Sequence, residues 1–468
     1  MLKGLEVSEI NYSWIIKNNY DFRIDSEYFA KKYSHIDNLL ARINCKRLDE
    51  LVSKISDGTH FTPNYTDKGY KFFSAINVSD NYFDIEAGYK YISEKEHHDL
   101  YSRCNPEPND VIMRKVGVGL RKACVVPDLR EQFSIFVSVA LIKCKFINSY
   151  YLSTFLNSKY GQIQLLRFNK GIGQPDLHLE DIARCIIPIY SNNFQEEIEQ
   201  MVKLAHSKLE ESKQLYADAE EQLLNELGLK DWHPKNQNIN VKKLSESFLN
   251  SGRLDAEYYQ SKYDEVEQII KRNNYDSLNN LCLLINHGMQ PPYIENGTMR
   301  VFSQKWIKDK EIDYSFIDDL NEPRTSNKFA LENADYVCRK NDIVHYSVGA
   351  NIGFCHTYLS DVPMMPGSFI TLIRADENKI APIYLGVVLN SIIGRMQSEK
   401  RKSGTAQPYV YPKDIKEFLI PILTKEVQTE ISAKIQKSFA LKAESKRLLE
   451  EAKLMVEKEI EKTGEISE

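Results

Sequence analysis

Two long stretches of the chain carry mainly apolar or small residues at steps of four and three. In the first stretch these positions are Ile198, Val202, Ala205, Leu209, Ser212, Tyr216, Ala219, Leu223 and Leu227. In the second they are Ile431, Ile435, Ser438, Lys442, Ser445, Leu449, Ala452, Val456 and Ile460, with three polar positions in the middle. This spacing is typical of a helix that buries one stripe along its length. We therefore predict two long helices that pack on each other as a coiled coil, in either direction. The alternative is that each helix packs on its own domain.

Outside these stretches, short apolar runs rich in β-branched residues alternate with glycine and proline turns. Segments 107–126 and 338–357 each place Asn-Asp before such a run and a glycine turn after it. Segments 150–165 and 383–398 instead have the apolar spacing of helices and share the tripeptide Leu-Asn-Ser. The pattern predicts an α+β fold class, with strands outnumbering helices in the globular parts.

The same phrases occur twice in the sequence. The stretch GIGQPDLHLEDIARCIIPI (171–189) returns as GTAQPYVYPKDIKEFLIPI (404–422), at an offset of 233 (407 − 174). Likewise FRIDSEYFAKKY (22–33) returns as GRLDAEYYQSKY (252–263), at an offset of 230 (255 − 25). A repeat of about 230 residues is far longer than a solenoid repeat, so each copy should be a domain with its own core.

The repeat and the helical stretches together predict the domain organisation. We expect an N-terminal arm (1–24), a first domain (25–190), a long helix (191–229), a connector (230–254), a second domain (255–423), a second long helix (424–462) and a tail (463–468). A helix of this kind is about 50 Å long, at about 1.5 Å per residue. It could hold two similar mixed α/β domains apart like a ruler.

Composition is that of an ordinary water-exposed globular protein, with 42% hydrophobic and 27% charged residues among 468. No apolar run approaches the roughly 20 residues of a membrane span, and the N-terminus lacks the apolar core of a signal peptide. We therefore expect a cytoplasmic protein that does not bind membranes, with reduced cysteines. The net charge of −5 means that any nucleic-acid contact must come from locally concentrated basic groups.

No catalytic motif is found in the sequence. The chain has neither an Asn/Asp-Pro-Pro-aromatic motif for amino-methyl transfer nor a phosphate-binding GxxxxGK[ST] loop. A nuclease pattern of Pro-Asp followed by Asp/Glu-x-Lys is also missing. The pair His97-His98 is expected to be solvated on a charged helix rather than to bind a metal. We expect no catalytic residue and no metal site, and therefore a protein that is not an enzyme.

Basic and amide side chains instead gather on corresponding loops of the two copies. Sequence-specific DNA binding needs such groups at base edges and phosphates. In the first copy the predicted DNA-binding residues are Thr59, His60, Thr62, Lys71, Arg114, Lys115, Arg121, Lys122, Arg167, Asn169, Lys170 and Gln174. In the second they are Gln290, Tyr293, Arg300, His345, Tyr346, Asn351, Lys400, Arg401, Lys402, Ser403, Gln407 and Tyr409. The copies differ most in these positions, as expected for one frame that reads two sequences.

The phrases DGTHFTPNYTDKGYKFF, NDVIMRKVG, GIGQPDLHLEDI and RLDAEYY, with a long helix after each copy, resemble the specificity (S) subunit of type I restriction-modification systems. The resemblance covers nearly the whole chain. It implies two target recognition domains, each gripping one half of a bipartite site in double-stranded DNA. It further implies that the helices scaffold two methyltransferase (M) subunits, to which restriction (R) subunits are added. S-adenosylmethionine, ATP and Mg²⁺ would then belong to those partners, with no cofactor in this chain.

Two other interpretations remain open at this point. One is the specificity subunit of a related system in which methyltransferase and nuclease are fused. The other is an assembly protein that acts through its coiled coil and whose domains bind protein rather than DNA. Retention on duplex DNA with a steep salt dependence would argue against the assembly protein.

Overall fold

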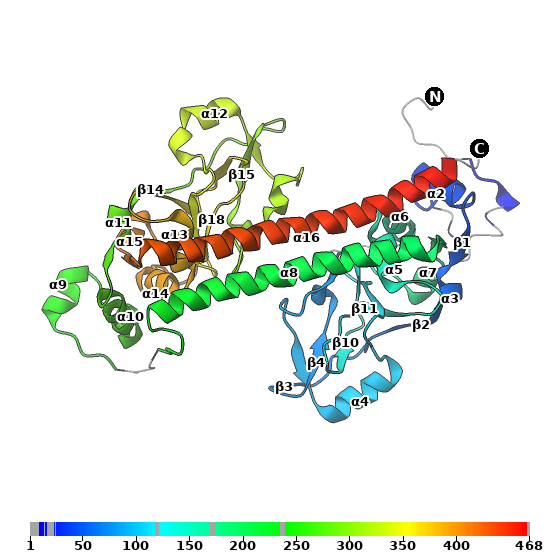
Figure 1. The fold of residues 1–468 in the computed structure, drawn as a ribbon, viewed down its shortest axis with the longest axis horizontal. Helices are drawn as coiled ribbons and strands as arrows, with labels where there is room; N and C mark the ends of the chain where they lie inside the picture. The colour runs from blue at the N-terminus through cyan, green and yellow to red at the C-terminus, as the bar shows by residue number, and fades with distance from the viewer. Residues whose placement is uncertain are drawn as a thin grey trace. The chain divides into compact units, whose positions relative to one another are not determined.

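The computed structural model describes residues 9–13, 15, 23, 25–117, 121–168, 175–234 and 239–465. It divides into two compact units. Unit 1 comprises Met1–Leu209 and Ala443–Glu468, and unit 2 comprises Glu210–Lys442. Both units combine sheets with helices, so the expected mixed α and β class is confirmed (Figure 1). None of the helices within the described ranges has the length and apolarity that a bilayer span requires.

The main sheet of unit 1 has the strand order β2-β11-β8-β9, with antiparallel neighbours throughout. Its strands are β2 (Val52–Asp57), β11 (Val139–Cys144), β8 (Val111–Arg114) and β9 (Ala123–Val125). Successive side chains of a strand point to opposite faces. Val111 and Met113 face one core with the helices, and Ile112 faces a second core with Phe73 and Phe133. Burial on both faces explains why β8, β9 and most of β11 are apolar, whereas β2 at the edge of the sheet is only partly buried and carries polar residues.

A second sheet covers the other face in unit 1, with the order β10-β4-β7-β3. Its strands are β10 (Phe133–Ile135), parallel to β4 (Tyr70–Phe73), then β7 (Lys90–Ile92) and β3 (Tyr65–Thr66). The smaller pairings join β1 (Cys45–Arg47) to β12 (Ile186–Pro188) and β5 (Val78–Ser79) to β6 (Tyr82–Phe83). The helices are α2 (Lys31–Leu40), α3 (Leu48–Leu51), η1 (Ala75–Asn77), α4 (Glu94–Arg103), α5 (Ser149–Asn157), α6 (Lys159–Arg167) and α7 (Leu179–Ala183).

Unit 2 has a main sheet of order β14-β20-β17-β18 and a second sheet of order β16-β15-β19. The main strands are β14 (Cys282–His287), β20 (Ile370–Ala375), β17 (Ile343–Tyr346) and β18 (Cys355–Thr357). The others are β16 (Arg324–Thr325), β15 (Met299–Phe302) with its parallel partner β19 (Met364–Pro366), and the pair β13 (Tyr275–Ser277) and β21 (Leu419–Pro421).

The helices of unit 2 follow the same plan. They are η2 (Leu244–Glu246), α9 (Phe248–Ser251), η3 (Ala256–Tyr259), α10 (Ser261–Lys271), α11 (Leu278–Leu281), η4 (Gln304–Trp306), η5 (Tyr314–Ile317), α12 (Asn327–Glu332), η6 (Ala334–Tyr336), α13 (Pro382–Asn390), α14 (Ile392–Arg401) and α15 (Pro412–Ile415). Helix α13 packs on β18 as α5 packs on β9.

Corresponding elements of the two main sheets share one register. Val52 and Cys282, which begin β2 and β14, are 230 positions apart (282 − 52). Asp57 lies opposite Ala140 in unit 1, as His287 lies opposite Thr371 in unit 2. Residues of the two units can therefore be compared position by position.

Two long helices, α8 (Asn192–Glu226) and α16 (Lys425–Glu465), have 35 and 41 residues. In unit 2 they run antiparallel, because Ser212 and Ser438 each donate a hydrogen bond to the other's carbonyl oxygen at 2.7 Å, and Gln222 bonds to Glu430. Most of the predicted seam is buried: Ile198, Val202, Leu223, Ile431, Ile435 and Val456. Leu209, Tyr216 and Leu449 are only partly buried.

The stripe of α16 shifts by one residue in its middle. Leu441 and Leu448 are buried, whereas Lys442 is exposed and Leu449 is only partly buried. A straight helix has 3.6 residues per turn, so its buried face drifts away from a strict heptad. Part of the polarity expected in the seam is thereby removed, although Ser438 and Ser445 remain buried.

Candidate nucleic-acid interface

Three segments of unit 1 that the sequence proposes as separate surfaces meet at one edge of the main sheet. Asp57 ends β2, Lys115 follows β8, and Asp176 lies in the repeated Gln-Pro phrase. The Lys115 ammonium lies 3.5 Å from an oxygen of Asp57 and 3.4 Å from an oxygen of Asp176. The amide of Gly117 donates to the carbonyl of Pro175 at 3.2 Å. We call Asp57, Lys115 and Asp176 the ionic triad.

Asp57 is the buried centre of this cluster. Its carboxylate is only 5% exposed and also accepts a 2.7 Å hydrogen bond from Arg103. The exposed ring of His60 lies 3.3 Å away. A buried carboxylate needs paired cations and hydrogen bonds. Lys115, itself only 6% exposed, is therefore paired with the buried Asp57 and with Asp176, which is 40% exposed. His60 is the solvent-facing neighbour of Asp57.

The same three positions of unit 2 hold His287, Ser347 and Tyr409, which we call the neutral triad. The Tyr409 hydroxyl is hydrogen-bonded to Nε2 of His287. The amide of Gly349 donates to the carbonyl of Pro408 at 2.9 Å, matching the Gly117–Pro175 bond. Gly117 and Gly349 both have positive φ, +88° and +104°, a conformation that favours glycine. The repeated Gln-Pro phrase thus docks a loop onto the β8–β9 or β17–β18 turn.

His345, predicted to contact DNA, is fully buried, and that prediction is wrong. Its ring bonds to the hydroxyls of Ser347 at 2.9 Å and Ser398 at 3.1 Å. Burial lowers the pKa of His345 to about 3, so the ring is neutral. The error arises because β17 is buried on both faces, so no polar-apolar alternation marks the side that faces solvent.

Arg167 is likewise directed into unit 1 and is not the DNA contact that the sequence predicts. Its side chain is 9% exposed, and its guanidinium lies 2.8 Å from Asp37 and stacks 4.4 Å from the Tyr28 ring centroid. Arg23 pairs with Asp25 and donates to the Arg167 carbonyl at 3.1 Å. The end of α6 is therefore held by the segment that precedes α2.

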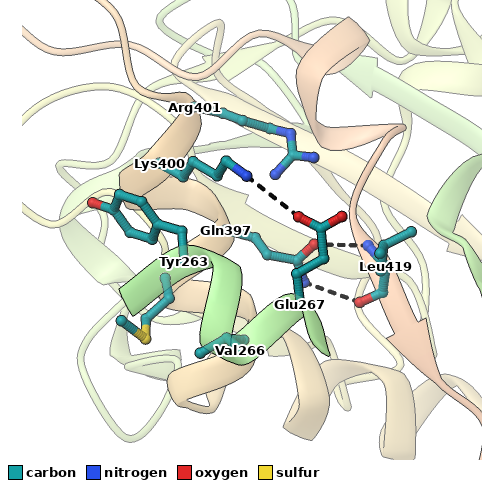
Figure 2. Close-up of a pocket in the computed structure, with 8 residues that line it drawn as sticks. Tyr263, Val266, Glu267, Gln397, Lys400, Arg401 and Leu419 are labelled. Carbon is teal, nitrogen blue, oxygen red and sulfur yellow. Dashed lines mark hydrogen bonds and ion pairs between the residues drawn. The ribbon is translucent and has the colours of Figure 1, made fainter. Parts of the chain in front are cut away.

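Unit 2 repeats this arrangement at the end of α14, which corrects the predictions for Lys400 and Arg401. Figure 2 shows Lys400 directed at Glu267, 3.4 Å away, with Arg401 beside it. Arg401 is 14% exposed and lies over the Phe418 ring. Arg253 donates to the carbonyls of Arg401 and Lys402. The repeated phrases RIDSEY and RLDAEY are thus explained by packing rather than by DNA contact.

Most other predicted cations have partners inside the chain. Lys71 pairs with Glu131 and Lys122 with Asp80. Arg114 and Arg300 donate to the backbone carbonyls of Val78 and Ile317, and Arg121 lies near Gln162. Of the remaining predicted residues, Thr59 is buried, and Tyr346, Lys402 and Tyr409 are partly exposed. The exposed ones are His60, Thr62, Gln290, Tyr293, Asn351, Ser403 and Gln407. Asn169, Lys170 and Gln174 lie outside the described residues.

Several residues of the site were missed by sequence reasoning, notably Asp57, Asp176, His287 and Ser347. A usable signal was present, because Asp57 and His287 are each a polar residue immediately before a glycine, at corresponding places in the two copies. Both glycines approach the backbone of a neighbouring strand: an added Cβ would lie 2.0 Å from the Ile135 oxygen at Gly58 and 2.3 Å from the Gly367 oxygen at Gly288.

The histidine pair at the start of α4 also differs from expectation. His97 is buried, stacks on Tyr70 at 3.9 Å between centroids, and bonds to the hydroxyl of Ser134 at 2.9 Å. Only His98 is exposed. Within the ranges the structure describes, no cluster of three or more His, Cys, Asp or Glu side chains could hold a metal ion.

We predict that Arg167→Met lowers the stability of unit 1 by about 2 kcal/mol, because it removes a charge-assisted hydrogen bond and a cation–π contact. Urea denaturation measures this loss, with the exposed Lys68→Met as the control. The DNA sequence preference should be unchanged. An Arg167→Met protein that is as stable as the wild type but has an altered DNA sequence preference would show that Arg167 contacts DNA.

No family model and no curated protein sequence matches this chain. Solved structures similar to it include a type I restriction-modification S subunit from M. genitalium, at 15% identity and a TM-score of 0.43, covering 90% of this chain and 96% of that chain. The HsdS subunit from Thermoanaerobacter tengcongensis is 15% identical, with a TM-score of 0.27, covering 89% and 95%. The type IIG restriction endonuclease BpuSI is 9% identical, with a TM-score of 0.30, covering 39% and 29%.

Proposed function

We propose that this chain is a non-catalytic specificity subunit of a type I restriction-modification complex and that its two units read the two halves of a bipartite DNA site. One observation carries the proposal. The ionic triad and the neutral triad lie at corresponding positions beside the main sheets of units 1 and 2 but have different chemistry. A shared frame with different side chains at its open edge suits two readers of different sequences.

The long helices are the proposed scaffold for two methyltransferase subunits, with restriction subunits added to that core. This scaffold role follows the resemblance to the specificity subunit, because Leu204 on α8 and Leu454 on α16, 47% and 48% exposed, are single exposed leucines of a kind common on protein surfaces. S-adenosylmethionine, ATP and Mg²⁺ would belong to those partners. We propose a cytoplasmic location, where the complex meets double-stranded DNA.

The proposal is tested by co-expressing this chain with the methyltransferase encoded beside its gene and mapping the methylated adenines. We expect one split motif that depends on this chain. Replacing residues 25–190 with a second copy of 255–423 should change only one half and make the two halves alike. Inserting one base pair between them should abolish methylation, because it rotates one half-site by about 35°.

Other outcomes favour other functions. A stable complex without any methylation that depends on this chain would support an assembly protein. A split motif that appears only with a partner carrying both methyltransferase and nuclease would support the related fused system.

A further inference from the structure

Unit 2 contains a continuous line of hydrogen bonds that begins at its open edge. The Tyr409 hydroxyl bonds to Nε2 of His287, and Nδ1 of the same ring lies 3.2 Å from the hydroxyl of Thr371. The Thr371 hydroxyl lies 2.7 Å from that of Ser347, which lies 2.9 Å from Nδ1 of His345. Tyr409 and His287 are partly exposed, and the later members are buried.

The line ends inside helix α14. Nε2 of His345 lies 3.1 Å from the Ser398 hydroxyl, which lies 3.0 Å from the backbone carbonyl oxygen of Gly394. We call the line from Tyr409 to Gly394 the hydroxyl–imidazole relay. Between Tyr409 at the outer end and Gly394 at the inner end, each side chain bonds to one neighbour on either side, and the Ser347 hydroxyl also lies 3.2 Å from the backbone carbonyl oxygen of His345.

The inner end sets the direction of the relay. A carbonyl oxygen only accepts, so the Ser398 hydroxyl donates to Gly394 and accepts from an Nε2–H of His345. A neutral imidazole with a proton on Nε2 has an acceptor at Nδ1, 2.9 Å from the Ser347 hydroxyl. The hydroxyl donates to this nitrogen rather than to the His345 carbonyl oxygen at 3.2 Å, because two lone pairs would otherwise face each other across the shorter contact. By the same logic Thr371 donates to Ser347, and His287 donates to Thr371 from Nδ1–H.

The outer end gives the same direction. The His287 ring then has an unprotonated Nε2, which accepts the proton of the Tyr409 hydroxyl. A phenol is a good donor and an imidazole nitrogen a good acceptor, so this pairing is also the chemically favoured one. The opposite direction would leave the bond from Ser398 to Gly394 unmade. Burial lowers the pKa of both His287 and His345, in keeping with neutral rings.

The consequence concerns what Tyr409 can offer to a ligand. Its only proton is committed to His287, so its oxygen presents only acceptor sites to the outside. Building on the proposed function, we infer that Tyr409 accepts a hydrogen bond from the exocyclic amino group of a base, adenine N6 or cytosine N4, in the major groove. The exposed side chains of Ser403, Gln407 and Tyr411 surround it on the same loop.

Unit 1 lacks the relay. Its residues in the places of Thr371, His345 and Ser398 are Ala140, Met113 and Leu165, which are buried and apolar. Its edge carries the ionic triad instead. Loss of the Tyr409 hydroxyl should therefore affect only the half-site that unit 2 reads.

The test uses the full-length protein and a duplex carrying its mapped motif. In the half read by unit 2, each adenine is replaced in turn by 2-aminopurine, which lacks the N6 amino group. Each cytosine is replaced in turn by a 2-pyrimidinone base that lacks the N4 amino group. Affinities are measured by fluorescence anisotropy for the wild-type protein, Tyr409→Phe, and the control Tyr411→Phe, a neighbouring tyrosine that is 45% exposed.

We expect one analogue to weaken wild-type binding about 3- to 10-fold, the effect of one neutral hydrogen bond. Tyr409→Phe should bind the natural duplex with an affinity lowered by the same factor, and its affinity should not fall further on that analogue. Tyr411→Phe should still respond to the analogue. An effect of 2-aminopurine identifies adenine, and an effect of the pyrimidinone identifies cytosine.

Two results would overturn the inference. One is a Tyr409→Phe protein that responds to every analogue as the wild type does, although its thermal denaturation curve shows that it is folded. The other is coupling of Tyr409 to a base position that has only acceptors, which would mean that the hydroxyl donates. Failure of the proposed function looks different, because no duplex would then be preferred by any of the proteins.

Discussion

Lowering the pH from 7 to 5 is expected to reduce the free energy of unfolding of unit 2 by about 4 kcal/mol. The cause is a pair of buried histidines in adjacent strands. Burial lowers the pKa of His345 to about 3 and that of His356 to about 4. His345 faces His287, Ser347 and Ser398.

The sign follows from proton binding by the two states. In the unfolded chain a histidine titrates near 6.5, so below that pH the unfolded state takes up protons that the native state still refuses. The stabilisation is complete above pH 6.5 and is lost as the pH falls towards the native pKa values. Each histidine costs about 1.4 kcal/mol per pH unit in this window, and two histidines over 1.5 units give the expected loss.

Amide hydrogen exchange resolved by residue measures this loss for unit 2 separately. The matched variant is His345→Met with His356→Cys, which installs the residues that unit 1 has there, Met113 and Cys124. Its stability at pH 7 should fall, while its dependence on pH between 6.5 and 5 should lose the part that these two histidines contribute and keep the part from His287, whose pKa is also lowered by burial. An unchanged pH dependence in this variant would show that other groups are responsible.

Gly161→Ala and Gly394→Ala should each destabilise their own unit by about 3 kcal/mol or more. The two glycines occupy the same turn of α6 and α14. An added Cβ would lie 2.3 Å from the Phe155 oxygen at Gly161 and 2.0 Å from the Leu389 oxygen at Gly394. Both neighbours are backbone atoms, which cannot rotate away as a side chain can.

Urea denaturation and hydrogen exchange measure the two losses, and each variant is the control for the other unit. Gly367→Ala is a third comparison, because the nearest atom to its added Cβ is the Phe302 oxygen at 3.3 Å. Gly367→Ala should lower the free energy of unfolding much less than Gly161→Ala or Gly394→Ala. A loss of less than about 1 kcal/mol in the free energy of unfolding for Gly394→Ala would contradict the close approach of α14 to the end of α13. Under the proposed function, Gly394→Ala also weakens reading of one half-site only.

The structure brings together three of the segments that sequence reasoning proposed, but it buries some of the residues chosen within them. The loops around His60, Lys115 and Tyr409 were all proposed, and the structure brings their segments together within each unit. Arg167 and Arg401 are charged and lie next to glycine turns, which made them look like surface contacts. Their direction depends on aromatic rings and carboxylates from elements remote in sequence.

The sequence by itself determined the mixed class of the fold, the two long helices and the recurrence of the same phrases at a nearly constant offset. These features follow from local patterns, namely the spacing of apolar residues and the placement of glycine and proline. Only the tertiary structure decided that Asp57, Lys115 and Asp176 form an ionic triad and that Tyr409 begins a buried relay. Hydrogen bonds and ion pairs act over about 3 to 4 Å, so they depend on sheet register and loop docking between residues far apart along the chain.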